Sequence, residues 1–194
     1  MRKLVLGAAL LLTACQAAFT DRERALIEES DSLMYVTVMP QDSVILRTPS
    51  VDFGEKELAS PLLQTLLDKM RYTVQDPSQD GVGIAAPQVG INRRAICVQR
   101  LDKEGEPFEC YVNIRIDSLS GAKVRGREGC LSVPQLRGMV TRSETAFISY
   151  QEPGKKERSR ERVDGFTAVI FQHECDHLEG ILYTDRADSL WVSD

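Results

Sequence analysis

The stretch Gln172-His173-Glu174-Cys175-Asp176-His177 contains both histidines of this chain. Histidines four residues apart lie on one face of a helix, so their two imidazoles can bind the same metal ion. The carboxylate beside the first histidine then reaches the water on that ion. This pattern predicts a helix with a hydrolytic metal site.

The predicted helix runs from about residue 163 to residue 178. Asp164 is its candidate N-cap, and Gly180 is the candidate residue that ends it. Three apolar residues share the stripe of the two histidines, so we expect the metal beside a hydrophobic pocket. These residues are Phe166, Val169 and Ile170.

A second helix is predicted earlier in the chain, with short strands between the two. Ser60-Pro61 has the cap and first-turn residues of a helix start, and leucines and Met70 follow at helical spacing. The order of helix, several strands and helix indicates an α+β domain. The predicted strands cover residues 95–98, 111–114, 122–125 and 146–150.

Composition fits one globular domain and argues against a nucleic-acid partner. The chain has 194 residues, of which 42% are hydrophobic, and its net charge is -5 at pH 7. A negative chain without a basic, aromatic-rich patch is a poor ligand for nucleic acid. The sequence does not indicate an oligomeric state.

Two histidines leave a metal ion short of ligands, and Cys130 is the strongest candidate for the third. It lies in Glu128-Gly129-Cys130-Leu131-Ser132, where the glycine lets the backbone pass close to another group. A thiolate binds borderline and soft divalent ions well. Three protein ligands and one water define a catalytic site, although an inert core thiol remains the alternative.

Three segments together resemble the peptide deformylase family. They are Gly81-Val82-Gly83-Ile84-Ala85-Ala86-Pro87-Gln88, Glu128-Gly129-Cys130-Leu131-Ser132 and Gln172-His173-Glu174-Cys175-Asp176-His177, and the similarity covers about residues 36–187. The resemblance implies small mixed or antiparallel sheets packed around a central metal-bearing helix. It also implies a hydrolase that removes the formyl group from N-formylmethionyl peptides or proteins and releases formate.

The resemblance gives the matching residues their roles. Metal-bound hydroxide would attack the formyl carbon, with Glu174 as general acid and base. The Gln88 side-chain amide and the Leu131 backbone N–H would stabilise the negative charge that develops on oxygen. The implied metal ligands are Cys130, His173 and His177.

The family binds its peptide as an added strand, so the substrate main chain would pair with the backbone near Gly83 and Gly129. Methionine would fill the pocket beside the metal helix. Glu128 matches a family position that supports the site. The implied substrate-binding residues are Val82, Gly83, Gly129, Arg137, Val169 and Ile170.

The ion and the reaction leave alternatives open. The resemblance suggests Fe²⁺ for the highest activity, whereas Zn²⁺ has no redox chemistry and would last longer outside the cytosol; Ni²⁺ and Co²⁺ are further candidates. One alternative function is a tethered metallopeptidase or amidase on the same helix. Another is a lipoprotein that binds formyl peptides without turnover, which the presence of Glu174 and Gln88 argues against.

The front of the chain resembles a bacterial lipoprotein signal. Met1-Arg2-Lys3 is basic, residues 4–12 are apolar, and Leu12-Thr13-Ala14-Cys15 matches the box in which Cys15 becomes an acylated N-terminus. We therefore expect a signal segment at 1–15, a polar tether at 16–34 and a catalytic domain at 35–194, held at the cell envelope by a membrane lipid. A buried segment at the front, or a start at Met34 that gives a cytoplasmic protein, are the alternatives.

Two further cysteines face each other in a predicted hairpin. A turn centred between Lys103 and Glu104 would set Cys97 directly opposite Cys110. Opposed residues approach disulfide geometry at only one of the two kinds of antiparallel strand pair, so a bridge and two free thiols both stay open.

Overall fold

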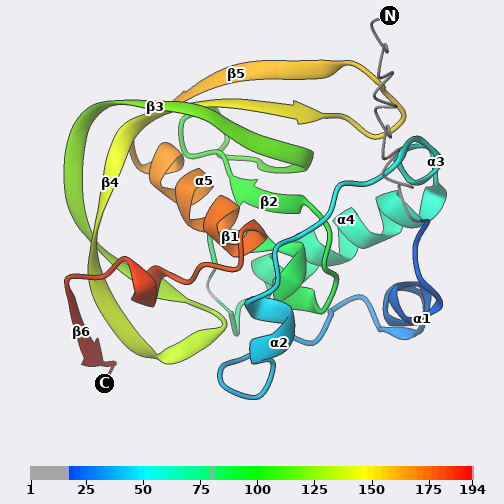
Figure 1. Cartoon of the computed structure of the whole chain (residues 1–194), viewed down its shortest axis with the longest axis horizontal. Coiled ribbons are helices and arrows are strands. Elements are labelled where there is room, and N and C mark those ends of the chain that lie inside the picture. The colour runs from blue at the N-terminus through cyan, green and yellow to red at the C-terminus, as the bar shows by residue number, and fades with distance from the viewer. Residues whose placement is uncertain (1–17, 80, 194) are drawn as a thin grey trace, which may run out of the picture.

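The computed structural model describes residues 18–79 and 81–193 (Figure 1). The expected signal segment at 1–15, with its candidate lipid site Cys15, lies outside the described residues. Within them, no helix is long and apolar enough to cross a membrane.

An antiparallel six-stranded sheet forms the framework, in the order β1-β2-β3-β4-β5, with β6 paired to β4. The long strands β3 and β4 bend around the central helix (Figure 1). The strands are β1 (Gly83–Ala85), β2 (Ala95–Gln99), β3 (Phe108–Cys130), β4 (Val133–Gln151), β5 (Arg158–Asp164) and β6 (Ser189–Val192).

Helix α5 lies at the centre and contacts strands β1 to β5, which confirms the predicted α+β fold around a metal-bearing helix. The helices are α1 (Asp21–Glu29), α2 (Ser43–Leu46), α3 (Glu55–Leu58), α4 (Pro61–Gln75) and α5 (Gly165–Leu178). Two short 3₁₀ helices are η1 (Ala86–Val89) and η2 (Tyr183–Asp185).

The two long helices begin at the predicted places, with one difference. The Ser60 hydroxyl accepts a hydrogen bond from the Leu62 N–H at 3.2 Å, and Pro61 opens α4. Helix α5 begins after Asp164, two residues later than predicted, because β5 continues through Asp164. The Asp164 carboxylate does not cap the helix but accepts a hydrogen bond from Thr145.

Two hydrophobic cores lie on either side of the sheet segment formed by β1 and β2. One core packs α4 and α1 against β1 and β2, and the other packs α5 against the strands. Ile84 and Cys97 contribute to the first core, whereas their strand neighbours Ala85 and Ile96 contribute to the second. This alternation is the period of a strand buried on both faces, and it fixes the position of β1 between α4 and α5.

The described part of the expected tether, residues 18–34, packs on the domain and is not a free linker. Phe19, Ile27 and Met34 are buried in the first core. The Lys69 ammonium also donates hydrogen bonds to the Ile27 and Ser30 carbonyls of this segment. The segment is polar in composition because its buried apolar residues are few and far apart in the sequence. Only Ile27 of the three lies in α1, and all three are buried in the core that includes α4.

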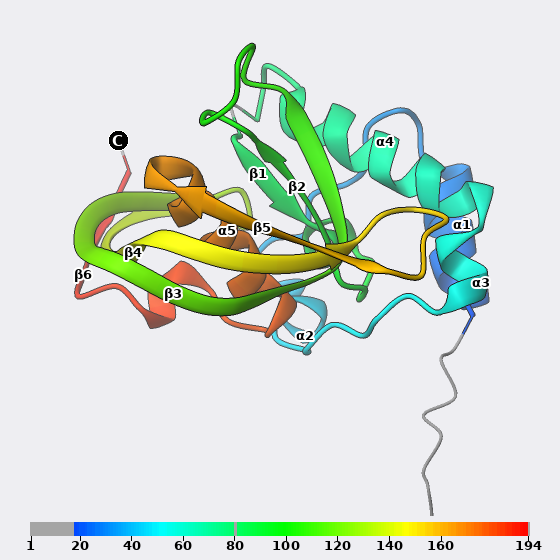
Figure 2. The same cartoon turned by 90° about the horizontal axis from the view of Figure 1, so that it is seen from above.

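A buried ion pair adds to this attachment. Arg93 is 2% exposed and donates to both carboxylate oxygens of Glu23 in α1, at 2.8 and 2.9 Å. Glu57 lies 3.1 Å from the same guanidinium. Hydrogen bonding to Arg93 lowers the Glu23 pKa despite the opposing effect of burial. Figures 1 and 2 place α1 at one end of the molecule and β6 at the other.

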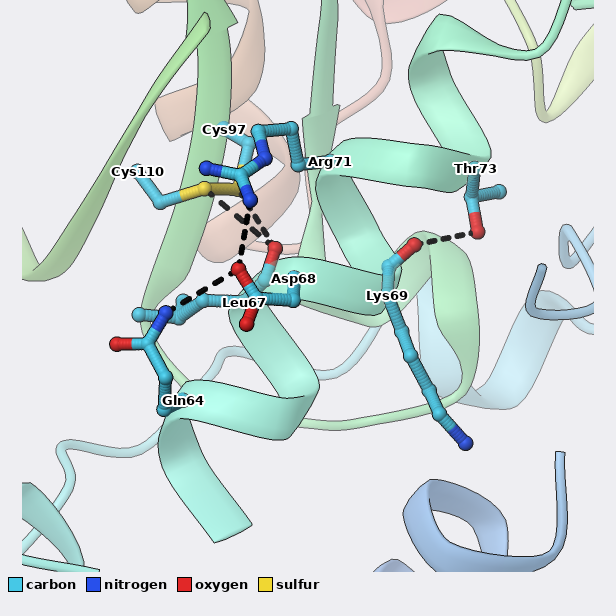
Figure 3. Close-up of a disulfide and its surroundings, with 8 residues drawn as sticks. All are labelled: Gln64, Leu67, Asp68, Lys69, Arg71, Thr73, Cys97 and Cys110. Atoms are coloured by element: carbon cyan, nitrogen blue, oxygen red, sulfur yellow. Dashed lines mark hydrogen bonds and ion pairs between the residues drawn. A yellow bond between two sulfur atoms is a disulfide. The ribbon is translucent and has the colours of Figure 1, made fainter. Parts of the chain in front are cut away.

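Cys97 and Cys110 form a disulfide, which decides between the two alternatives left open by the sequence (Figure 3). The two residues are direct partners in the β2–β3 register. The Leu67 carbonyl oxygen of α4 lies 3.7 and 3.6 Å from the Cys97 and Cys110 sulfurs. The disulfide thus joins β2, the direct neighbour of β1, to β3 beneath α4.

Candidate active site and metal centre

Three side chains from two distant segments meet at one point. Cys130 ends β3, and His173 and His177 lie one turn apart on α5. Their ligand atoms all lie within 4.8 Å of one another, and the Cys130 Sγ is 3.2 Å from the His177 Nε2. A thiol and two imidazoles match the donor set of a three-ligand catalytic metal site, so the predicted ligands fit a divalent ion.

The Cys130 thiol is prepared for ligation. Burial alone would raise its pKa, but the adjacent His177 and His173 rings lower it well below the ordinary value. The thiolate is the form that binds metal. The remaining free thiol among the described residues, Cys175, behaves in the opposite way, because burial raises its pKa.

Glu128 orients the first histidine. Its Oε2 lies 2.9 Å from the His173 Nδ1, so the opposite ring nitrogen is the one turned toward Cys130 and His177. Arg142 donates to both Glu128 oxygens, at 2.8 and 3.0 Å. Burial would raise the Glu128 pKa, yet hydrogen bonds from His173 and Arg142 lower it to about 2. Glu128 is therefore a permanent acceptor for the ring.

Arg142 continues this support to the end of α5. Its Nη1 donates to the Asp176 carboxylate at 2.5 Å, and Asp176 also accepts two hydrogen bonds from Arg186. Asp176 thus holds the arginine behind Glu128. Sequence patterns do not reveal Arg142, because it comes from β4 and matches none of the three motifs.

Glu174 lies beside the three-ligand cluster and is 4% exposed. Its Oε2 is buried and has no hydrogen-bond partner among the described residues. Burial raises its pKa to about 7. A buried carboxylate with an open oxygen at neutral pH has the properties of a general base.

Gln88 points its amide at the cluster. Its Oε1 accepts a hydrogen bond from the Ala85 N–H at 2.8 Å, which fixes which end of the amide faces inward. Its Nε2 lies 3.5 Å from the Cys130 Sγ and 3.3 Å from the Ser132 Oγ. Leu131 follows Cys130 in the turn between β3 and β4, so its N–H belongs to the same corner.

A cavity of about 470 Å³ opens over these groups. Its walls contain all six predicted substrate-binding residues, together with Gln88, Leu131, Cys130, His173 and Glu174. His177 is 1% exposed and lies behind the cavity wall. The predictions did not include these further lining residues: Ser78, Gln79, Gly81, Arg127 and Pro134.

Comparison with known proteins identifies this arrangement. The family model of polypeptide deformylase matches residues 34–191. The chain belongs to the peptide deformylase family. It is 36% identical over 152 residues to a peptide deformylase of Leptospira biflexa, a match that covers 75% of this chain and 83% of that protein.

Solved peptide deformylases agree with the fold. A class I type b peptide deformylase from Acinetobacter baumannii with bound actinonin superposes with a TM-score of 0.72 at 37% identity, over 80% of this chain and 99% of that one. The same enzyme with bound Met-Ala-Ser gives a TM-score of 0.71 at 37% identity, over 79% and 98% of the two chains.

The family assignment confirms the predicted activity. This chain is a metal-dependent hydrolase that removes N-formyl groups, and the described residues contain a cysteine and two histidines that can hold the ion. The tethered peptidase and the non-catalytic binding protein are not favoured. Helix α1 precedes the matched residues 34–191, so it is an addition to the part shared with the family.

Proposed function

We propose that this deformylase acts on N-formylmethionyl peptides with Glu174 as its general acid and base. The observation that carries the proposal is the buried, unpartnered Glu174 oxygen beside a cluster of one thiol and two imidazoles. We further propose that Cys130, His173 and His177 hold one Fe²⁺ or Zn²⁺ ion, with Ni²⁺ or Co²⁺ as substitutes. Such an ion would supply Lewis acidity, which polarises a carbonyl group and lowers the pKa of water.

The protein side chains move the proton and stabilise the charge. Glu174 accepts the proton of the attacking water and passes it to the departing amine, which leaves formate and a free amino terminus. Negative charge develops on the former carbonyl oxygen. The Gln88 Nε2 and the Leu131 N–H are the donors for that oxygen, and Gln88 is pre-oriented by its hydrogen bond from Ala85.

The peptide pairs with β1 as an added strand. β1 ends the strand order, so one of its edges is open for main-chain hydrogen bonds. The methionine side chain enters the cavity against Val169 and Ile170, and the turn after Gly129 lies on its other side. The Acinetobacter baumannii enzyme with bound Met-Ala-Ser supports a substrate of this class.

Formate release from formyl-Met-Ala-Ser tests the proposal directly. The chain from residue 16 onward is purified anaerobically and loaded with Fe²⁺ or, separately, with Zn²⁺. We expect turnover that Glu174→Ala abolishes, while Glu157→Ala, at an exposed position on the β4–β5 connection, is the matched control. Equal turnover of the Glu174→Ala protein would remove Glu174 from the mechanism.

We also propose that the enzyme is a lipoprotein of the cell envelope, acylated on Cys15. The Cys97–Cys110 disulfide supports this location, since disulfides persist in oxidising compartments. A chain that began at Met34 would lack Ile27, which is buried in the first core, and Glu23, which forms an ion pair with Arg93. Both contacts favour the longer chain. Cell fractionation tests the location, and Cys15→Ala should release the protein from membranes; a wholly cytosolic wild-type protein would refute it.

The packing of α1 would then set the orientation on the membrane. The Ala18 carbonyl accepts a hydrogen bond from Arg93 at 3.1 Å, so the first described residue, three positions after Cys15, is held on the domain. Three residues span about 10 Å at most. The α1 end would therefore lie next to the lipid, while β6 and the part of β4 that pairs with it lie toward the opposite end (Figure 1).

A further inference from the structure

Two arginines line the mouth of the substrate cavity without an acidic partner among the described residues. Arg127 and Arg137 both belong to the cavity wall, and neither forms an ion pair within residues 18–79 and 81–193. The described acids of that wall are Glu128 and Glu174, and Glu128 is already bound to Arg142 and His173. The mouth is thus positive in a chain whose net charge is -5.

The two guanidinium groups flank the same short piece of backbone. Arg127 precedes Gly129 by two residues on β3, and both residues line the cavity wall. The Arg137 side chain crosses over Gly129, where an added Cβ would lie 2.8 Å from the Arg137 Cδ and Nε. The glycine therefore makes room for Arg137 beside Arg127.

Trp191 is a neighbour of both arginines. The Arg127 Cζ lies 5.9 Å from the centre of the Trp191 ring, and Trp191 is the direct partner of Arg137 in the β4–β6 register. Arg137 donates from its Nη1 to the Pro134 and Leu136 carbonyls, which holds its position while using one nitrogen of a five-donor fork. Two arginines restrained in this way are suited to bind a carboxylate.

The spacing matches a short peptide. In a strand paired near Gly129 and Leu131, each residue advances about 3.3 Å, so the last Cα of a tripeptide lies about 7 Å beyond the Cα of its methionine, with the terminal carboxylate just past it. The three steps from Cys130, the last residue of β3, back to Arg127 span at most about 10 Å. The end of a tripeptide or tetrapeptide therefore reaches the two guanidinium groups.

We propose that Arg127 and Arg137 form a carboxylate subsite, so that the enzyme favours formylated peptides carrying a carboxylate about three residues from the formyl group. The carboxylate is that of a free C-terminus in a short peptide, or of an acidic side chain at the same distance. This inference rests on the proposed function and adds to it a preference among formylated substrates. Long neutral chains lack this contact.

The test compares kcat/KM for three peptides with the full chain: formyl-Met-Ala-Ser as the free acid, the same peptide as its amide, and formyl-Met-Ala-Asp amide. We expect the free acid to exceed the Ser amide about tenfold, equivalent to about 1.4 kcal/mol, mainly through KM. The ratio should fall toward about 2 in Arg127→Gln, recover in part in Arg127→Lys, and fall at high salt.

The control variant removes the same charge elsewhere. Arg160 lies on β5 with an 83% exposed side chain and is outside the cavity wall, so Arg160→Gln should keep the wild-type ratio. A preference for the free acid alone would assign the subsite to the chain end, and a preference for the Asp peptide as well would assign it to any carboxylate at that distance.

A second measurement does not depend on turnover. Trp191 is the sole tryptophan of the chain, so its fluorescence should respond to the product Met-Ala-Ser more strongly than to the product amide. Equal wild-type kcat/KM for acid and amide, or an unchanged ratio in Arg127→Gln, would overturn the subsite alone. No turnover of any peptide would instead overturn the proposed function, and the subsite with it.

Discussion

Removing the Cys97–Cys110 disulfide should lower the stability of the folded enzyme by about 3 kcal/mol. The bridge closes a loop with a sequence separation of 13. Chain entropy of the unfolded state accounts for about 3 kcal/mol for a loop of that length at 25 °C. For a domain of 150–250 residues, such a change corresponds to a fall in Tm of about 6–12 °C.

The assay is thermal unfolding of the zinc-loaded protein with and without a phosphine reductant. Zinc avoids redox changes at the metal, so the reductant acts on the disulfide. The Cys97→Ala/Cys110→Ala double variant is the matched control, because its Tm should be low from the start and insensitive to the reductant. Cys97 is fully buried, so the variant should lie somewhat below the reduced wild type.

The consequence for substrate binding follows from the strand order. β2 lies between β3 and β1, the strand proposed to pair with the peptide, and Ile84 of β1 pairs directly with Cys97. Loosening β2 should therefore raise KM for the peptide more than it lowers kcat. A reduced protein with the same Tm and the same KM as the oxidised one would refute the view that the bridge supports this part of the sheet.

Three further outcomes are expected. Glu174→Ala should lower turnover about a hundredfold or more while the metal content per chain, measured by atomic spectroscopy, stays near that of the wild type. Gln88→Ala should lower kcat about 10²–10³-fold with a smaller change in KM, measured by formate release, because it removes one donor to the developing negative charge. Glu23→Gln should destabilise the protein by about 2 kcal/mol in urea unfolding, less than for a pair broken completely, because Glu57 still faces Arg93. Since the folded-state pKa of Glu23 is lowered, its contribution is present above the pKa of an unfolded glutamate and is lost as the pH falls through the folded value, so the difference from wild type should shrink on acidification.

The chemistry could be predicted from the sequence because each part of it is local. The histidine pair and Glu174 share one helical turn. Cys130 directly follows a glycine, Gly129, and Gln88 ends a glycine-rich segment. Each motif can therefore be recognised from a few consecutive residues. Their convergence around α5 is what the fold adds.

The supporting contacts could not be predicted, because they join residues far apart in the chain. Arg142 reaches Glu128 and Asp176 from another strand, and Trp191 stacks on Arg127 from the last strand. A polar segment such as 18–34 likewise reveals its buried face only when α4 is present. For the disulfide, the sequence supplies the register but not the kind of strand pair.

Gly83 places β1, the strand proposed to bind the peptide, directly against Glu174, the proposed general base. A Cβ at Gly83 would lie 2.5 Å from the Glu174 Oε1 and 2.9 Å from the Ile170 Cγ2, so only glycine lets β1 approach α5 this closely. That approach would bring a peptide bound on the β1 edge within reach of Glu174. The same approach removes water from the carboxylate and raises its pKa to about 7. The contact proposed to position the formyl group would therefore also adjust the pKa of the base that takes the proton of the attacking water, and widening the strand–helix distance would weaken both effects together.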